Sequence, residues 1–255
     1  MHINWIGMRT LYKRETWRFL KVWNQTLVAP MITTLIFLAI LSLAMGGSTR
    51  TVHGVPFTHF IAPGLIMMAM VQNAFANTSS SFMIAKLQGV IIDWLMPPFA
   101  AGELAVGFAA GGVTRGLMVG CTVALAMSFF VPLSLASFGY LLFFAVASTL
   151  MLSLLGLITG IYADTPDQSA TITNFVVTPL SFLSGTFYSI QDLPEFWHKL
   201  SHMNPFFYMI DGFRYAMLGS SDASPQLGMI ILLATNLVLY TLVQTMLAKG
   251  WRLKS

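Results

Sequence analysis

Few side chains in this sequence have the types and spacing that support chemistry. His198 and His202 are four residues apart, so both imidazoles fall on one face of a helix, a spacing that can hold a metal ion. A metal site needs more ligands, and no third ligand is evident beside them. The sequence also contains no G-x-x-x-x-G-K-S/T phosphate loop, no H-E-x-x-H motif and no convincing Ser/His/Asp set. We therefore expect no catalytic residue, no metal, and no cofactor or nucleotide bound by this chain.

Polar side chains inside two apolar runs indicate a different kind of chemistry. Asn73 and Asn77 are four residues apart in one run, and Asn174, Thr178 and Ser181 recur at helical spacing in another. Each set therefore lines one face of a helix. Two interpretations are open. The side chains form interhelical hydrogen bonds, each worth about 1 kcal/mol or less, or they line a seam that rearranges as a substrate passes.

Two isolated side chains lie within a third apolar run. Arg115 is a basic residue at membrane depth, where a charge is a functional candidate by default. It can instead extend to an interface or neutralise Glu103, three helical turns away. Cys121 is the single cysteine, so it has no disulfide partner, and we expect it to be a small buried apolar residue.

Glycines recur about every four residues in two runs, which lets two membrane helices approach closely. We expect internal helix packing from these positions, and no ligand site. They are Gly107, Gly111, Gly112, Gly116, Gly120, Gly156 and Gly160.

The elements that position these residues are membrane spans. Of the 255 residues 56% are hydrophobic and only 9% are charged, whereas soluble domains average about 25% charged residues. The mean hydropathy is +0.74. Runs of roughly 20 apolar residues cross a bilayer as a helix. We therefore predict one all-α integral membrane domain over residues 1–255 with six transmembrane helices, at about 28–46, 58–80, 104–127, 138–162, 168–188 and 226–248.

The basic residues predict the orientation. An even number of crossings places nine of the 13 Lys and Arg residues on one side, which the positive-inside tendency makes cytoplasmic. Both termini are thus expected in the cytoplasm, and the basic composition needs no nucleic-acid partner to explain it. The nine are Arg9, Lys13, Arg14, Arg18, Lys21, Lys86, Lys249, Arg252 and Lys254.

Residues 9–24 predict an amphipathic helix before the first span. Arg14, Arg18 and Lys21 fall on one stripe, with aromatic and apolar residues opposite. Such a helix lies in the membrane interface with its cations toward the cytosol. It either anchors the chain only, or also touches a cytosolic partner.

Residues 82–103 form the longest cytoplasmic connection. Ile92, Trp94 and Leu95 are apolar, and Pro97-Pro98 ends any helix that carries them. A short amphipathic helix of this kind inserts into a groove on another protein, or lies on its own bundle.

Residues 188–222, between the last two spans, predict short helices broken by prolines and charges. Such a segment cannot cross the bilayer, but it can lie at the surface or dip in and return when protein covers its backbone.

These segments together resemble type-2 ABC exporter permeases along nearly the whole chain. In and just before residues 188–222, which correspond to the external hairpin of these permeases, the matching residues are Leu183-Ser184-Gly185-Thr186, Leu193-Pro194, Asn204-Pro205, and Asp211-x-x-Arg214 with Gly219. The loop carries Gly89, Leu95, Pro97-Pro98 and Glu103-Leu104. One departure is Ala85-Lys86-Leu87-Gln88, where many relatives have acidic or arginine residues.

The resemblance implies the membrane subunit of an exporter in the bacterial cytoplasmic (inner) membrane. Two permease copies, a homodimer, would work with two copies of a separate ATPase that binds ATP-Mg. The substrates of such permeases are polysaccharides, lipid-linked glycans or amphipathic drugs. The alternative is an ATP-independent secondary carrier or channel, which usually needs midplane acids or an inverted repeat.

The resemblance also implies residue roles, which stay expectations here. Those coupling to the ATPase would be Gly89, Ile92, Trp94, Leu95, Arg14 and Arg18. Those lining the translocation path would be Asn73, Asn77, Asn174, Thr178 and Ser181. Those forming an external gate would be Gly185, Tyr188, Pro205, Phe206 and Arg214.

Overall fold

The computed structural model describes residues 4–45, 51–52, 54–91 and 99–252. Apart from one short antiparallel pair, β1 (Thr51–Val52) with β2 (Val55–Pro56), the described elements are helical. The helices are α1 (Trp5–Leu20), η1 (Asn24–Val28), α2 (Ala29–Ala44), α3 (Phe57–Leu87), α5 (Ala101–Met127), α6 (Phe138–Tyr162), α7 (Pro166–Ile172), η3 (Thr173–Val177), α8 (Thr178–Phe182), η4 (Ile190–Asp192), α9 (Glu195–Met203), α10 (Pro205–Leu218) and α11 (Pro225–Ala248).

Five helices within the described residues are long and apolar enough to cross a membrane. They confirm five of the predicted spans, and α3 continues to Leu87, about two turns beyond the predicted end. The run predicted at 168–188 differs, because its helix covers only Pro166–Phe182 as α7, η3 and α8 in succession. A turn follows at Leu183 because Gly185 adopts φ +72°, a conformation that favours glycine.

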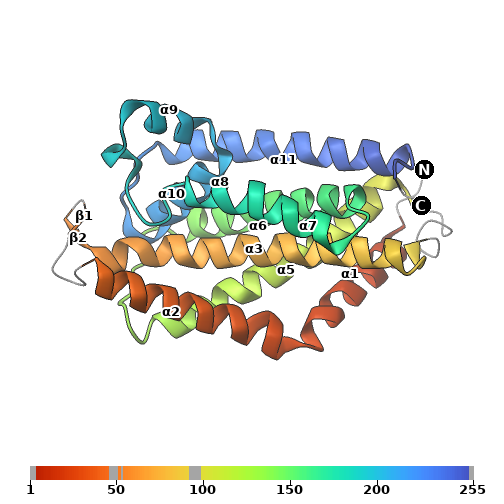
Figure 1. Cartoon of the computed structure of the whole chain (residues 1–255), viewed down its shortest axis with the longest axis horizontal. Helices are drawn as coiled ribbons and strands as arrows, with labels where there is room; N and C mark the ends of the chain where they lie inside the picture. Colours follow the sequence, from red (N-terminus) through yellow and green to blue (C-terminus); the bar gives the residue numbers. More distant parts are fainter. Residues whose placement is uncertain (1–3, 46–50, 53, 92–98, 253–255) are drawn as a thin grey trace.

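The long helices run roughly along one axis, with α3 central among them (Figure 1). The start of α1 and the end of α11 lie at one end of the molecule, and β1, β2 and α9 lie at the other. We call these the terminal end and the hairpin end. Helix α3 packs against α2, α5, α6 and α10, so most of its length is buried.

Glycines allow the close approach of α3, α5 and α6. A Cβ atom at Gly112 would lie 3.1 Å from the Ala74 carbonyl oxygen, and one at Gly156 would lie 2.5 Å from that of Phe75. The glycine ladders therefore serve helix packing, as predicted. Gly107 and Gly111 make the same kind of contact with α1, at Leu11 and Glu15.

The segment between α8 and α11 has one surface helix and one buried helix. In α9, Phe196, Trp197 and Met203 are exposed. Helix α10 begins where the Asn204 side chain accepts a hydrogen bond from Phe206 N at 3.0 Å, and it is buried among α3, α6 and α11. It ends at Gly219, which has φ +76°. The predicted short helices are thus present, joined at Asn204-Pro205.

One burial prediction is wrong. Cys121 is exposed on α5 instead of buried in the bundle. The faces of a membrane helix that meet lipid are as apolar as those that meet protein, so hydropathy alone does not distinguish them.

Candidate functional site

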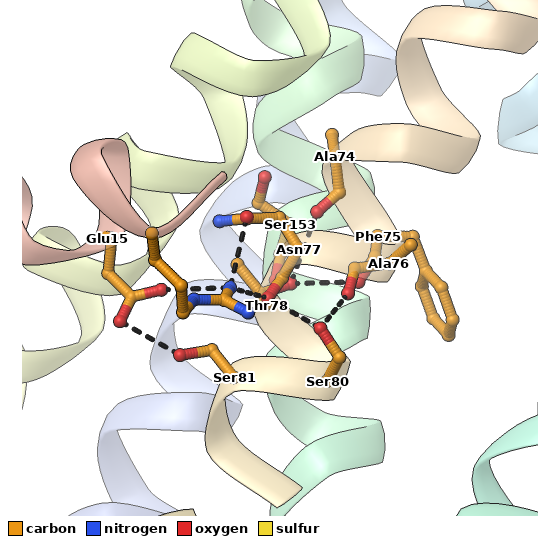
Figure 2. A network of polar contacts seen from close by, with 10 residues as sticks. Glu15, Ala74, Phe75, Ala76, Asn77, Thr78, Ser80, Ser81 and Ser153 are labelled. Carbon is orange, nitrogen blue, oxygen red and sulfur yellow. Dashed lines mark hydrogen bonds and ion pairs between the residues drawn. The ribbon is translucent and has the colours of Figure 1, made fainter. Parts of the chain in front are cut away.

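A buried carboxylate anchors α1 to α3. Leu11, Glu15 and Phe19 form the buried stripe of α1, and Glu15 is 0% exposed. Its Oε1 accepts a hydrogen bond from Ser81 Oγ at 2.8 Å, and its Oε2 lies 3.2 Å from Arg18 Nη2 (Figure 2). A buried charge needs such partners because its desolvation is costly.

Arg18 completes the contact between the two helices. Its Nη2 donates to the Asn77 carbonyl oxygen at 2.8 Å and to Asn77 Oδ1 at 3.1 Å. Arg14 and Lys21 are exposed, as the predicted cationic stripe requires, but Arg18 turns inward. The reason is Glu15, one turn earlier, which supplies a buried counter-charge. One feature of the sequence could have predicted this inward turn of Arg18. Glu15 lies four residues from both Leu11 and Phe19, so an acidic side chain falls on the apolar face of the helix.

The terminal end of α1 is fixed to α5. Glu103 Oε1 accepts a hydrogen bond from Asn4 N at 2.8 Å, and its Oε2 accepts one from Ala100 N at 2.9 Å. Tyr12 OH and Thr114 Oγ1 are 3.1 Å apart. Glu103 therefore caps both helices and does not neutralise Arg115, whose Nη2 donates to Asn73 Oδ1 at 3.0 Å.

A cavity of about 540 Å³, lined by both polar and apolar side chains, lies between α3 and the α7–η3–α8 run. It brings together three of the residues predicted to line a path, namely Asn73, Asn174 and Thr178. The two polar sets that the sequence placed on separate helices therefore face each other. The other lining residues are Gln72, Phe75, Ala76, Ser79, Ser80, Met83, Pro166, Ser169, Ala170, Thr173 and Val177.

The remaining two predicted path residues point elsewhere. Asn77 is buried against α1 through Arg18. Ser181 is also buried, and its Oγ donates to the Val177 carbonyl oxygen of its own helix at 2.8 Å. Helical spacing placed them correctly on their helices, but their side chains do not line the cavity.

The predicted coupling loop is described only in part. Gly89 follows α3 with φ +72°. Ile91 is buried and joins a hydrophobic cluster with Leu11 and Phe82. Ile92, Trp94 and Leu95 lie outside the described residues.

At the hairpin end, Arg214 is buried with 2% of its surface exposed. Its Nη2 donates to the Gly185 carbonyl oxygen at 2.6 Å, and its guanidinium carbon lies 4.0 Å from the ring centroid of Phe60 on α3. Asp211 is 4.0 Å from Arg214 Nη1 and accepts backbone hydrogen bonds from Asp222 and Ala223. Arg214 thus joins the hairpin to the start of α3.

The other predicted gate residues surround this junction. Tyr188 OH donates to the Phe182 carbonyl oxygen at 3.2 Å. Pro205 is half-buried at the start of α10, and Phe206 is buried in the main hydrophobic core. Asp222, which the sequence did not single out, accepts hydrogen bonds from Ser189 Oγ and Ile190 N.

His198 and His202 lie side by side on α9, with their rings tilted relative to each other, and both are half-buried. Their ring centroids are 4.5 Å apart, and His202 Nδ1 lies 2.9 Å from the His198 carbonyl oxygen. Among the described residues, no group of three His, Cys, Asp or Glu residues could hold a metal ion.

A charged cluster ties three segments together at the terminal end. Asp164, in the connection between α6 and α7, accepts a hydrogen bond from Lys86 Nζ at 2.8 Å and lies 3.7 Å from Arg252 Nη1. The hydrogen bond from Lys86 and its positive charge lower the pKa of Asp164 below the ordinary value of 3.8.

The low pKa of Asp164 predicts a pH effect. The ionised carboxylate stabilises the fold fully above the unfolded value of 3.8, and this contribution is lost as the pH falls through the lower folded pKa. We expect Asp164→Asn to lower the unfolding temperature slightly at pH 6, and we expect this difference to shrink as the pH falls toward 2. Thermal unfolding in detergent checks this, and an equal difference at both pH values would contradict it.

Known proteins similar to this chain are transport proteins and nodulation proteins. Residues 7–218 match the family model described as ABC-2 type transporter. The inner membrane transport permease YadH of Escherichia coli (strain K12) is 38% identical over 255 residues, 100% of each chain. Nodulation protein J of Rhizobium leguminosarum bv. trifolii is 26% identical over 221 residues, 85% of this chain and 82% of the relative.

The family match and the similarity to YadH extend over most or all of the chain, including α1, the cavity and the hairpin-end junction. The protein therefore belongs to the ABC-2 type transporter family.

Proposed function

We propose that this chain is the membrane subunit of an exporter in the bacterial inner membrane, driven by ATP hydrolysis on a separate ATPase. Two permease copies would form a homodimer with two ATPase chains. In this arrangement both termini are cytoplasmic, α1 lies in the membrane interface, and Pro166–Phe182 forms a short sixth crossing. The hairpin-end segment is re-entrant, with α10 dipping into the membrane.

The observation that carries the proposal is the continuity between α1 and the cavity. Glu15 and Arg18 bind α3 at Ser81 and Asn77, one turn from Asn73 in the cavity wall. A force applied by the ATPase to α1, or to the predicted coupling loop within residues 82–103, would therefore move α3. The cavity would then change shape, because packed helices shift as rigid bodies. The hairpin-end junction at Arg214 would close the route on the far side.

The proposed homodimer would place a second copy against two apolar faces that this single chain leaves uncovered. Helix α2 exposes a row of apolar side chains, and Phe175 in η3, the residue after the cavity residue Asn174, is 78% exposed. A second copy placed against these faces would close the cavity from the side. The exposed residues of α2 are Ile32, Ile36, Phe37, Ile40 and Leu43.

Reconstitution tests the proposal. The chain is purified with a cognate ABC ATPase. Transport of a panel of glycans, lipid-linked glycans and amphipathic drugs into proteoliposomes is then measured with and without ATP. We expect a complex of both chains and nucleotide-dependent transport, which Trp94→Asp reduces. Absence of mutual binding, together with export unchanged by Trp94→Asp, would reject it. Transport without nucleotide or a second chain would indicate a carrier or channel.

Glu15→Gln tests the connection between α1 and α3. The variant keeps the side-chain shape but leaves Arg18 without its counter-charge. Since Arg18 is 34% exposed, water screens part of the loss, and we expect destabilisation of about 1–2 kcal/mol. Export in proteoliposomes should fall about tenfold, roughly 1.4 kcal/mol of barrier, while ATPase binding remains. Glu195→Gln on exposed α9 is the control. If Glu15→Gln exports at the wild-type rate, the contacts of Glu15 with Arg18 and Ser81 do not couple the movement of α1 to α3.

A further inference from the structure

Two arginines converge on one polar face of α3. Arg18 of α1 binds Asn77, and Arg115 of α5 binds Asn73, through one Nη2 each. The two asparagines are one helical turn apart, so the guanidinium groups bind at points roughly 6 Å apart. The two guanidinium groups of this arginine pair are held in place by the hydrogen bonds they donate to two asparagines of a single helix.

The arginine pair has more positive charge and more donors than the described residues satisfy. Glu15 is the carboxylate paired with Arg18, and no described carboxylate lies within ion-pair distance of Arg115. Three buried nitrogens also have no hydrogen-bond partner among the described residues: Arg18 Nε, Arg115 Nε and Asn77 Nδ2. All three are donors, and Asn77 is 0% exposed. Unsatisfied buried donors of one kind indicate a missing acceptor.

In the proposed orientation the arginine pair would lie near the level of the lipid headgroups, and not deep in the hydrocarbon as the sequence suggested for Arg115. It is next to the junction of α1 with η1, where the amphipathic helix gives way to the first span. Trp17 and Trp23 flank this junction and are 63% and 55% exposed, as is typical of residues at a membrane–water interface. Arg18 and Arg115 are both half-buried, so each guanidinium is accessible in part.

We propose that the arginine pair binds the phosphate of an anionic membrane lipid from the cytoplasmic leaflet. A phosphate accepts several hydrogen bonds, and guanidinium groups match its oxygens in pairs. Binding would neutralise the surplus charge of Arg115, supply acceptors to the orphan donors after a small shift of the side chains, and hold α1 against α3 and α5. This site does not depend on the proposed transport function, because it would stabilise the fold of a protein that exports nothing.

Lipid titration of the delipidated full chain tests the proposal. Native mass spectrometry counts bound dioleoyl phosphatidylglycerol, dioleoyl phosphatidylcholine and soluble glycerol 1-phosphate, and thermal unfolding is followed in parallel. We expect one saturable phosphatidylglycerol site that raises the unfolding temperature, with the other two compounds at least tenfold weaker. Equal binding of phosphatidylcholine would overturn the proposal. Displacement of the lipid by glycerol 1-phosphate at similar concentration would assign the site to soluble phosphates instead.

Matched variants locate the site. Arg115→Gln and Arg18→Gln should each weaken phosphatidylglycerol binding about tenfold, whereas Lys21→Gln removes an exposed cation of the same junction and should leave it unchanged. If all three variants weaken binding equally, the lipid is attracted by the general positive charge of this surface and not by a specific site, which would contradict the proposal. If Arg115→Gln does not fold, Arg115→Lys keeps the charge and should bind about threefold more weakly, because an ammonium group cannot contact two phosphate oxygens side by side. Wild-type binding by Arg115→Lys and Arg18→Gln would overturn the proposal.

Discussion

Arg214→Leu is expected to lower the free energy of unfolding by about 3–5 kcal/mol and to release the segment around Gly185 from α3. The guanidinium is buried, and its contacts with Gly185, Phe60 and Asp211 join three segments of the chain. Leucine fills part of the volume but leaves the Gly185 carbonyl unsatisfied and Asp211 without its cation. Thermal unfolding in detergent measures the loss, and limited proteolysis within residues 183–204 reports the release.

Lys199→Leu is the matched control for Arg214→Leu. Lys199 also belongs to the hairpin-end segment, but its side chain is 74% exposed and pairs only with Glu195 on the surface. Surface pairs of this kind contribute little, so the variant should unfold like the wild type. If Arg214→Leu has the same unfolding temperature and the same protease resistance as Lys199→Leu, the buried contacts of Arg214 do not hold this segment against α3.

Gly156→Leu is expected to prevent accumulation of folded protein, at a cost of about 3 kcal/mol or more. Even the first added atom, Cβ, would lie 2.2 Å from Thr78 Oγ1 and 2.5 Å from the Phe75 carbonyl oxygen. Because one of these neighbours is backbone, α3 and α6 must separate, which also breaks the hydrogen bond of Thr78 Oγ1 to the Ser153 carbonyl oxygen. The yield of monodisperse protein in size-exclusion chromatography is the measurement.

Gly139→Leu is the control in the same helix. A Cβ atom at Gly139 meets nothing within 4 Å, so the larger residue is accommodated there. We expect a wild-type yield. If both glycine variants accumulate equally well, the close approach of α3 and α6 at Gly156 is not required for folding.

The spans were predictable because hydropathy is a local property. A helix in hydrocarbon must satisfy its backbone internally and be apolar for about 20 residues, and five predicted runs have this form in the structure. The run at 168–188 was predicted too long, since its apolar side chains continue past Phe182 into a turn that contains Gly185. The apolar composition of a segment does not indicate the residue at which its helix ends.

The direction of individual side chains was less predictable. A helical wheel placed Arg14 and Arg18 on one cationic stripe, but Arg18 turns toward Glu15 and Asn77. Cys121 was expected inside the bundle and is exposed. For Arg18 the partners are Glu15, one turn earlier, and Asn77 on a distant helix, and for Cys121 the packing of other helices decides which face of α5 is covered.

An all-α membrane protein with polar residues on two of its helices could be predicted from the residues alone, because hydrophobic length and helical period are encoded locally. Three relations required the packed helices: Asn73 and Asn174 line one cavity, Glu15 anchors α1 to α3, and Arg18 and Arg115 bind neighbouring turns of α3. The reason is that helix packing in a membrane depends on the fit of small residues and on hydrogen bonds between helices, and hydropathy measures neither.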